Sequence, residues 1–158
     1  MVETGKIRVA KDKAELVKAL TSGGGSTGPF QTFADVIAFA ASLGAKHNKR
    51  VALEEISKRE PGSIRLEQFV SMGYDWVIKL LAVTDTQDIK MLSLHEDKYV
   101  NQRNQIFEEY ANGGLEILQH ELRGAVDYTE RILLLLDYEA GTQPESPDEE
   151  FDLTKFLT

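Results

Sequence analysis

The sequence predicts a mainly α protein with a single compact domain of about five to seven helices. Apolar residues recur at helical spacing along most of the chain, and runs of alternating β-branched residues are scarce. The length of 158 residues, with 42% hydrophobic and 28% charged residues, suits one folded domain. We assign this helical domain to residues 1–140 and expect residues 141–158 to form a disordered acidic tail.

The N-terminal region predicts a short extended segment, a helix and a loop. Residues 6–10, KIRVA, alternate charged and apolar side chains and form either a short strand or an extended lead-in. Residues 12–20 have apolar side chains at helical spacing, which predicts an amphipathic helix. Residues 22–29 contain four glycines and one proline, so we expect a flexible loop with no regular element. A phosphate-binding loop is not predicted, because no Lys-Ser or Lys-Thr pair follows the last glycine.

The stretch FADVIAFAASLG, residues 33–44, predicts the central core helix because it has a wide apolar face. Thr32 and Asp35 have the spacing of a helix N-cap, and Gly44 suits the C-terminal stop. Three small side chains on this helix allow a neighbouring helix to approach closely, namely Ala38, Ala40 and Ala41.

The middle of the chain predicts one kinked helix or two short helices over residues 66–83, with the break at Gly73. Trp76, the only tryptophan, is expected in the core. Residues 84–94 predict a further short helix, and Ser93 with Glu96 forms a candidate capping box for the helix that follows.

The last two helices are predicted after residue 93. The tandem glycines Gly113 and Gly114 lie inside the first of them, so we expect a bend or a close helix crossing there. The final helix begins near Asp127 and Glu130 and continues into RILLLL, residues 131–136. Four consecutive leucines cannot all face one core edge, so this helix is either central or partly buried in an oligomer interface.

The charge is divided unevenly along the chain. The net charge is −8, but residues 1–79 contain 12 Lys and Arg against 9 Asp and Glu, a net charge of +3, and residues 80–158 have a net charge of −11. Residues 141–158 alone contain five acids and one lysine. An evenly acidic protein would repel nucleic acid, whereas this distribution leaves room for a basic surface.

The sequence contains no arrangement typical of catalysis or metal binding. Cysteine is absent, no serine lies in a GxSxG or SxxK motif, and the three histidines, His47, His95 and His120, lie far apart. We therefore expect no enzyme activity, no metal and no cofactor. The N-terminus has no signal-peptide core, and no run approaches the ~18 apolar residues of a membrane span, so a cytoplasmic protein without a membrane partner is expected.

A basic segment follows the predicted core helix and is the candidate nucleic-acid site. Such a cluster can bind phosphates through Coulomb attraction and counterion release. The alternative is a solvated loop that pairs with Glu54, Glu55, Glu60 and Glu67. The candidate residues are Lys46, His47, Lys49, Arg50, Lys58, Arg59 and Arg65.

The acidic tail is the candidate partner-binding segment. Apolar residues after an acidic run are typical of short segments that fold into a partner's groove. The alternatives are a frayed terminus, or a tail that lies over the protein's own basic segment and competes with nucleic acid. The candidate anchors are Phe151, Leu153, Phe156 and Leu157.

Four segments together resemble a bacterial family, the DNA phosphorothioation (Dnd system)-associated protein 4 group. They are IRVAKDKAELVKAL, GPFQTFADVIAFAASLGA, IRLEQF and IFEEYANGGLEILQHEL. The resemblance covers about residues 7–136 and leaves the acidic tail outside. The order of IRVAKDK, FAASLG, a tryptophan-bearing middle and GGLEIL is more distantly similar to DndE, the small helical subunit of the modification machinery.

The resemblance implies a setting more than a reaction. It implies work beside a sulfur-modification or phosphorothioate-dependent phage-defence complex, with Dnd-system proteins as partners. The likeness to DndE implies assembly as an oligomer and DNA contact through surface lysines, for which Lys46, Lys49 and Arg50 are the positions we select.

Three functions from different classes are therefore predicted, in this order. The first is a non-enzymatic accessory protein of a DNA phosphorothioation or linked restriction system, acting by protein contacts and weak DNA contacts. The second is a helical DNA-binding regulator that uses the basic segment 46–65. The third is a metal-dependent nuclease.

Overall fold

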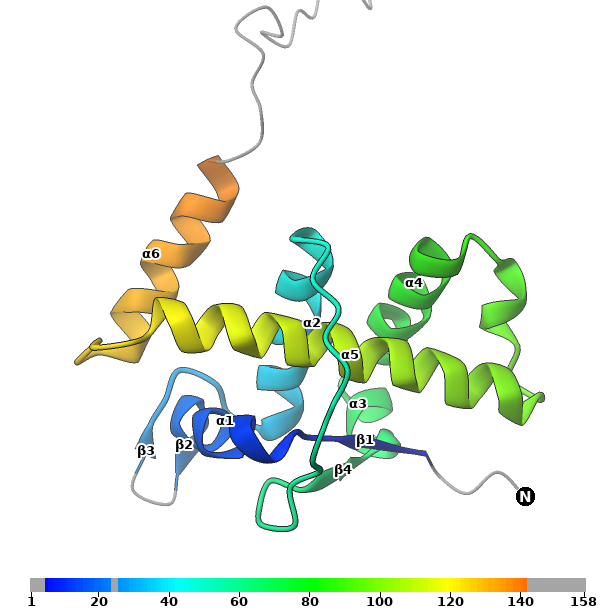
Figure 1. The fold of residues 1–158 in the computed structure, drawn as a ribbon, viewed down its shortest axis with the longest axis horizontal. Helices are drawn as coiled ribbons and strands as arrows, with labels where there is room; N and C mark the ends of the chain where they lie inside the picture. The colour runs from blue at the N-terminus through cyan, green and yellow to red at the C-terminus, as the bar shows by residue number, and fades with distance from the viewer. Residues whose placement is uncertain (1–4, 24–25, 142–158) are drawn as a thin grey trace, which may run out of the picture.

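The structure is a computed structural model, and it describes residues 5–23 and 26–141. These residues form a mainly α domain, as predicted (Figure 1). The α-helices are α1 (Ala14–Leu20), α2 (Phe33–Lys46), α3 (Leu66–Ser71), α4 (Asp75–Thr86), α5 (Asp97–Glu121) and α6 (Tyr128–Gly141). The 3-10 helices are η1 (Lys11–Lys13) and η2 (Ile89–Leu92). The strands are β1 (Lys6–Arg8), β2 (Ser22–Gly23), β3 (Ser26–Thr27) and β4 (Ser63–Arg65).

The core lies where α2 crosses the long helix α5 (Figure 1). Glycines bring the two backbones together: a Cβ atom on Gly114 would overlap the carbonyl oxygen of Ala40, and one on Gly44 would overlap that of Tyr110. Phe107 of α5 also packs edge-on against Phe69 of α3, with 5.5 Å between ring centroids. The close crossing expected at the tandem glycines is confirmed, and α5 passes through them without a break.

The ends of α2 match the sequence prediction at the first residue and differ at the last. Thr32 and Asp35 form the predicted capping box, with Asp35 N donating to Thr32 Oγ1 at 3.2 Å. Gly44, however, does not end the helix, which continues to Lys46 and is capped at His47. Gly44 is needed for the close approach of α5, so the prediction of a stop at this glycine was wrong.

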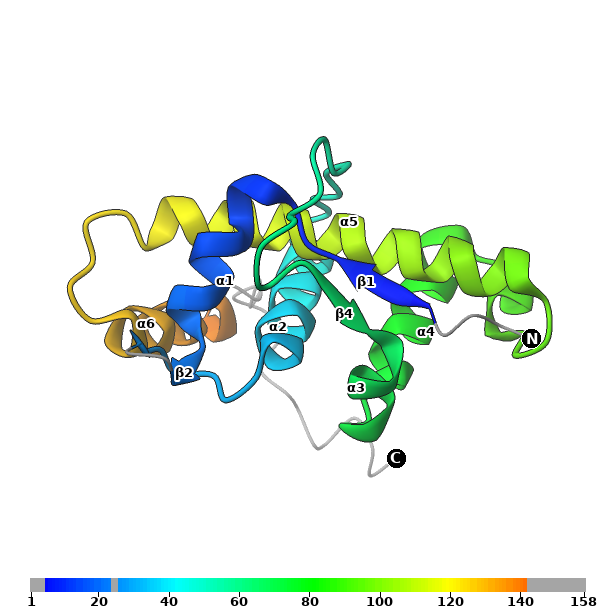
Figure 2. The same cartoon turned by 90° about the horizontal axis from the view of Figure 1, so that it is seen from below.

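A two-stranded ribbon lies across one face of the domain, with α2 and α5 behind it (Figure 2). In it, β1 pairs antiparallel with β4, with Lys6 opposite Arg65 and Ile7 opposite Ile64. Ile7 and Ile64 are buried, which fixes the register because a slip of one residue would expose both. The N-terminal segment is therefore a strand.

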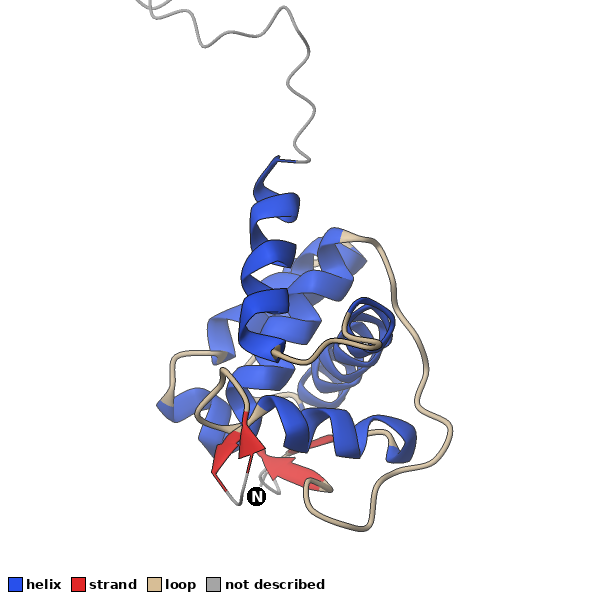
Figure 3. Cartoon of the chain, turned by 90° about the vertical axis from the view of Figure 1, so that its left-hand side faces the viewer, coloured by secondary structure: helices blue, strands red, loops and turns tan. Residues whose placement is uncertain are grey.

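The glycine-rich segment forms a second, smaller ribbon. Ser22 pairs with Thr27 and Gly23 with Ser26, so β2 and β3 are antiparallel. The prediction that residues 22–29 contain no regular element was wrong, and Gly23 contributes a φ of 104°, which glycine adopts without strain. Both ribbons lie at the end of the molecule away from the tip of α6 (Figure 3).

The predicted break at Gly73 is confirmed, and α3 and α4 are separate helices. Gly73 has a φ of 81°, which glycine adopts without strain. The prediction for Trp76 was wrong: its side chain is 64% exposed. Ile78 and Ala82 are the buried residues of α4, so the tryptophan lies on the outer side of the helix.

The beginning of α5 also differs from the prediction. The helix starts at Asp97 with Glu96 as its N-cap, and no side chain makes a capping bond there, so the capping box of Ser93 and Glu96 does not form. Arg103, only 6% exposed, instead donates to the carbonyls of Met91 and Ser93. This contact holds η2 against α5.

The final helix, α6, projects from the end of α5 (Figures 1 and 3). Asp127 caps it, as predicted, by accepting from Glu130 N at 3.2 Å. Ile132 and Leu135 are buried, whereas four large apolar side chains are 44–65% exposed, namely Leu133, Leu134, Leu136 and Tyr138. The helix is thus peripheral, and one of its two predicted settings, a central position, is wrong.

Two further expectations concern the acidic tail and the membrane. The tail residues Phe151, Leu153, Phe156 and Leu157 lie outside the described residues. Among the described helices, none combines the length and the apolar character that crossing a membrane requires.

Candidate interaction surfaces

The structure divides the seven predicted basic residues into two groups. The first group lies at the end of α2 and just after it, next to α5 and α6, and consists of Lys46, His47, Lys49 and Arg50. Lys58, Arg59 and Arg65 lie in and beside the β1–β4 ribbon. The two groups therefore contact different elements of the domain.

Lys46 and His47 anchor α6 through Glu139. Lys46 Nζ lies 2.9 Å from Glu139 Oε2 and also donates to the Glu139 carbonyl, and His47 Nε2 lies 2.5 Å from Glu139 Oε1. Burial raises the pKa of Glu139, but hydrogen bonds from Lys46 and His47 outweigh it and the net pKa is lowered. The ionised carboxylate is therefore favoured in the folded state.

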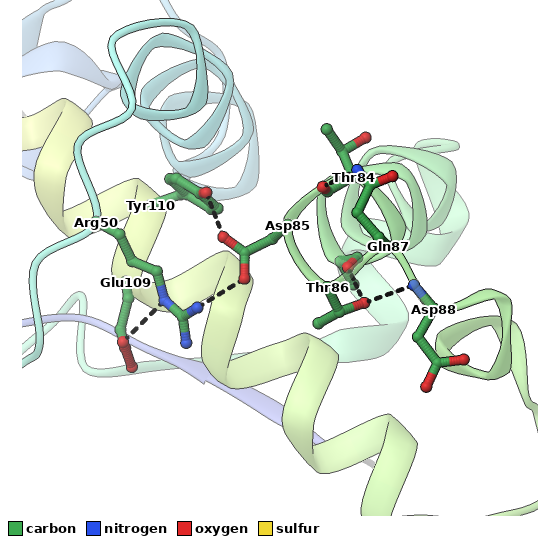
Figure 4. A network of polar contacts seen from close by, with 9 residues as sticks. Arg50, Thr84, Asp85, Thr86, Gln87, Asp88, Glu109 and Tyr110 are labelled. Atoms are coloured by element: carbon green, nitrogen blue, oxygen red, sulfur yellow. Dashed lines mark hydrogen bonds and ion pairs between the residues drawn. The ribbon is translucent and has the colours of Figure 1, made fainter.

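Arg50 joins three parts of the domain (Figure 4). Its guanidinium lies 2.8 Å from Asp85 at the end of α4 and 3.1 Å from Glu109 on α5. Tyr110 donates from its hydroxyl to the same Asp85 at 2.5 Å. Burial raises the pKa of Tyr110, and the hydrogen bond to Asp85 adds to this increase. Arg50 thus fixes the segment after α2 against both helices.

The first group of cations is accordingly engaged within the domain. Lys49 completes it, with Nζ at 3.6 Å from Glu116 Oε1. A phosphate that bound here would have to compete with carboxylates already in place. The solvated-loop alternative named Glu54, Glu55, Glu60 and Glu67 as the pairing acids. Of these, Glu67 pairs weakly with Arg65 of the second group, whereas the acids that pair with the first group come from α4, α5 and α6.

The second group is far less engaged. Arg65 has a weak pair with Glu67 at 3.9 Å, with both side chains more than half exposed. Lys58 and Arg59 are exposed, and within the described part of the chain neither forms an ion pair. They line one side of a pocket of about 820 Å³ that also includes Lys11, Glu15 and Glu55.

An ion pair between the half-exposed Arg8 and the buried carboxylate of Glu108, which the sequence did not predict, secures the ribbon to α5. Glu108 is 4% exposed and accepts from Arg8 N at 2.7 Å and from Arg8 Nε at 2.8 Å. Burial raises the pKa of Glu108, and the bonds from Arg8 oppose that increase. Paired acids on a helix, such as Glu108 and Glu109, are typical of surface charge, and the alternation in KIRVA predicted only a strand or an extended lead-in.

An apolar surface lies on α3 and α4. Its exposed members are Val70, Met72, Trp76 and Leu80, with exposed fractions of 43–64%. One of these four, Met72, also lines a groove of about 590 Å³, together with Phe30, Phe39, Tyr74 and Val77 among others. We call these four exposed residues and this groove the Trp76 surface.

Tyr74, which lines the groove, donates a hydrogen bond to Asp35 at 2.5 Å. This bond raises the pKa of Tyr74 to about 12.

The described residues show no arrangement of metal ligands. In that part of the chain, no group of three or more histidine, aspartate and glutamate side chains is placed to hold a metal ion. His47 is engaged with Glu139, and His120 lies with Glu116 and Glu121 around a pocket between α5 and α6.

Comparison with known proteins places the chain in a family. No curated protein and no solved structure matches it. A family model does match, over residues 6–156. The match extends into the acidic tail, which corrects the expectation that the resemblance stops near residue 136. The chain belongs to the family described as DNA sulphur modification system-associated protein 4.

Proposed function

We propose that this protein is a non-enzymatic accessory subunit of a bacterial DNA phosphorothioation or linked restriction system. It acts through contacts with other proteins of that system and through weak, salt-dependent contacts with DNA. The family establishes the association with a DNA sulphur modification system, and the proposal adds the mode of action.

The Trp76 surface is the observation that carries the proposal. Trp76 is 64% and Leu80 60% exposed on α4, and Val77 of the same helix lines the aromatic-lined groove. Covering a large apolar side chain is worth about 1.5–3 kcal/mol, and tryptophan is among the residues that dominate binding at interfaces. Among the described residues, the ring of Trp76 makes a cation–π contact with Lys79, whose Nζ lies 5.1 Å from the ring centroid. A protein of the same system is the partner that we propose for this surface.

Binding of purified full-length chain to each purified protein of its own modification system tests this role. We expect at least one stable complex, and we expect Trp76→Asp to weaken it about tenfold or more because a charge replaces an interface anchor. Leu94→Asp is the matched control, since Leu94 is 59% exposed and belongs to the segment between η2 and α5, not to the Trp76 surface. Absence of any complex, together with absence of DNA binding at low salt, would overturn the proposal.

A DNA-binding regulator is the second candidate, and the unpaired cations favour it. Lys58 and Arg59 are exposed and Arg65 is only weakly paired, so these three residues are the available part of the basic segment 46–65. Charge reversal at these three positions is then expected to abolish DNA binding. Deletion of residues 142–158, which removes five acids and one lysine, is expected to strengthen it. Unchanged binding in both variants would exclude this candidate.

A metal-dependent nuclease is the third and weakest candidate. Its test is incubation of plasmid DNA with the protein and Mg²⁺ or Mn²⁺, together with thermal unfolding with and without the metal. We expect no cleavage and no metal-dependent shift in the unfolding temperature. Cleavage that disappears on chelation would contradict the non-enzymatic role.

A further inference from the structure

The β1–β4 ribbon presents basic side chains on its outer face. Ile7 and Ile64 point inward and are buried, so their neighbours Lys6 and Arg65 point outward, directly opposite each other. The pairing continues beyond the strands, with Ser57 N donating to the Val9 carbonyl and Val9 N donating to that of Gly62. Residues 58–61 therefore bulge out of the ribbon between two bonds to the same residue.

The bulge holds two further cations in a fixed position. Ser57, only 6% exposed, donates from Oγ to the carbonyl of Arg59 at 2.8 Å. A Cβ atom on Gly62 would lie 3.0 Å from the Ser57 carbonyl oxygen, so the base of the bulge is tightly closed. Lys58 and Arg59 thus extend from a braced backbone and are exposed.

The local charge is opposite in sign to that of the whole chain. Residues 6–11 and 55–65 contain six Lys and Arg against two Glu, a net charge of +4, in a protein of net charge −8. Arg8 is engaged with Glu108, and Lys11 lies 3.0 Å from Glu55. Within the described residues, Lys6 has no ion pair, and the residue opposite it in the ribbon, Arg65, is also a cation.

Like charges directly opposite each other destabilise an antiparallel ribbon. This chain has many acids that could neutralise them, and it uses such acids for Lys46, Lys49 and Arg50. Among the described residues, Lys6, Lys58 and Arg59 form no ion pair and Arg65 forms only a weak one with Glu67. These charges therefore suit a polyanion that is supplied from outside. A two-stranded ribbon also has the dimensions that the major groove of B-DNA admits.

We infer that the outer face of the ribbon, with Lys6, Lys58, Arg59 and Arg65, binds the phosphate backbone of duplex DNA. The inference rests on the DNA contact in the proposed function and names the surface that makes it. The binding is expected to depend on salt and to be independent of sequence, because lysine and arginine on phosphates carry no base readout.

Titration of labelled duplex DNA with the full-length protein at several salt concentrations tests this inference. The variant Lys6→Gln/Arg65→Gln removes two charges and their mutual repulsion. We expect its affinity to fall by about tenfold or more at low salt, and the slope of log K against log salt to become shallower by about 2. Because the repulsion is gone, its midpoint in urea unfolding should be unchanged or higher. Lys58→Gln/Arg59→Gln should weaken DNA binding similarly.

The matched control is Lys90→Gln/Arg123→Gln, which removes the same charge from exposed residues near opposite ends of α5. We expect this control to bind DNA like the wild type. If both ribbon variants bind like the wild type, the ribbon is not the contact, although the DNA contact of the proposed function stands. If the wild type itself binds no duplex at low salt, the ribbon contact and the DNA contact of the proposed function are both overturned.

Discussion

At the scale of single residues, the fold depends on positions where two backbones touch. Gly44, Gly113 and Gly114 lie at the crossing of α2 and α5 and against the segment after α2. A Cβ atom on Gly113 would overlap the carbonyl oxygen of Lys49. Because each obstacle is backbone, no side chain can move aside to make room.

Gly114→Ala is therefore expected to lower the free energy of unfolding by about 1–3 kcal/mol or more, as overpacking does in other cores. Gly141→Ala is the control, because Gly141 ends α6 and a Cβ atom added there would have nothing within 4 Å. Urea unfolding of both variants measures the effect. Equal stability of the two would show that the helices can separate at no cost.

Glu139 predicts a pH dependence of stability. Its pKa lies below the ordinary 4.5, so the ionised carboxylate stabilises the folded state fully above that pH and ceases to do so as the pH falls through the lowered pKa. The difference in unfolding free energy between the wild type and Glu139→Gln should be largest near neutral pH and vanish in acid. Urea unfolding from about pH 7 to about pH 3 tests this. A difference that grows in acid would contradict it.

The sequence predicts residues less well where burial decides their role. Trp76 is the largest apolar residue of its segment, yet it is exposed, whereas Glu108 is acidic and buried. The exposure of each residue depends on which side of its helix faces the core. Periodicity alone cannot identify that side in α4, because apolar residues occur on several sides of this helix. The cap at Thr32 and the break at Gly73 were predictable because each depends only on neighbouring residues.

At the scale of elements, α6 is the helix whose apolar side chains are left largely exposed by the rest of the domain. Ile132, Leu135 and Glu139 form its buried side, and apolar residues cover much of the remainder. The sequence signal for this was the run of four leucines, which predicted either a central helix or an oligomer interface. With the first excluded, a second copy of the chain is the occupant that we propose for the exposed leucines.

Leu134→Asp is accordingly expected to reduce the molar mass in solution from that of an oligomer to that of the 17.7 kDa monomer. Light scattering during size-exclusion chromatography measures it. Leu80→Asp serves as the control, because Leu80 is 60% and Leu134 54% exposed, on different helices. A wild-type protein that is monomeric at high concentration would contradict self-association through α6.

At the scale of the whole molecule, the distribution of charge determines what the surfaces can bind. The net charge of −8 is compatible with a net charge of +4 over residues 6–11 and 55–65, because acids gather elsewhere. The helical class and the family could be predicted from the sequence, since spacing and motifs are local. The division of the basic segment could not, because Glu116, Asp85, Glu109 and Glu139 reach it from distant parts of the chain.

The acidic tail also bears on what the protein can bind. The family match includes residues 142–156, so this region is part of what the family shares. Its anchors Phe151, Leu153, Phe156 and Leu157 stay a prediction of partner binding. Replacing all four with alanine is the corresponding test, and we expect it to weaken binding to a protein of the system without changing the unfolding midpoint.

The central claim is that the protein works by contact within its modification system. Its most direct test is quantitative mass spectrometry of the system's proteins recovered with a tagged full-length chain from cells that carry the system. We predict that the wild type and Leu94→Asp recover those proteins. We expect Trp76→Asp to recover them in amounts lower by about tenfold or more. Recovery of none by the wild type, or equal recovery by Trp76→Asp, would contradict the claim.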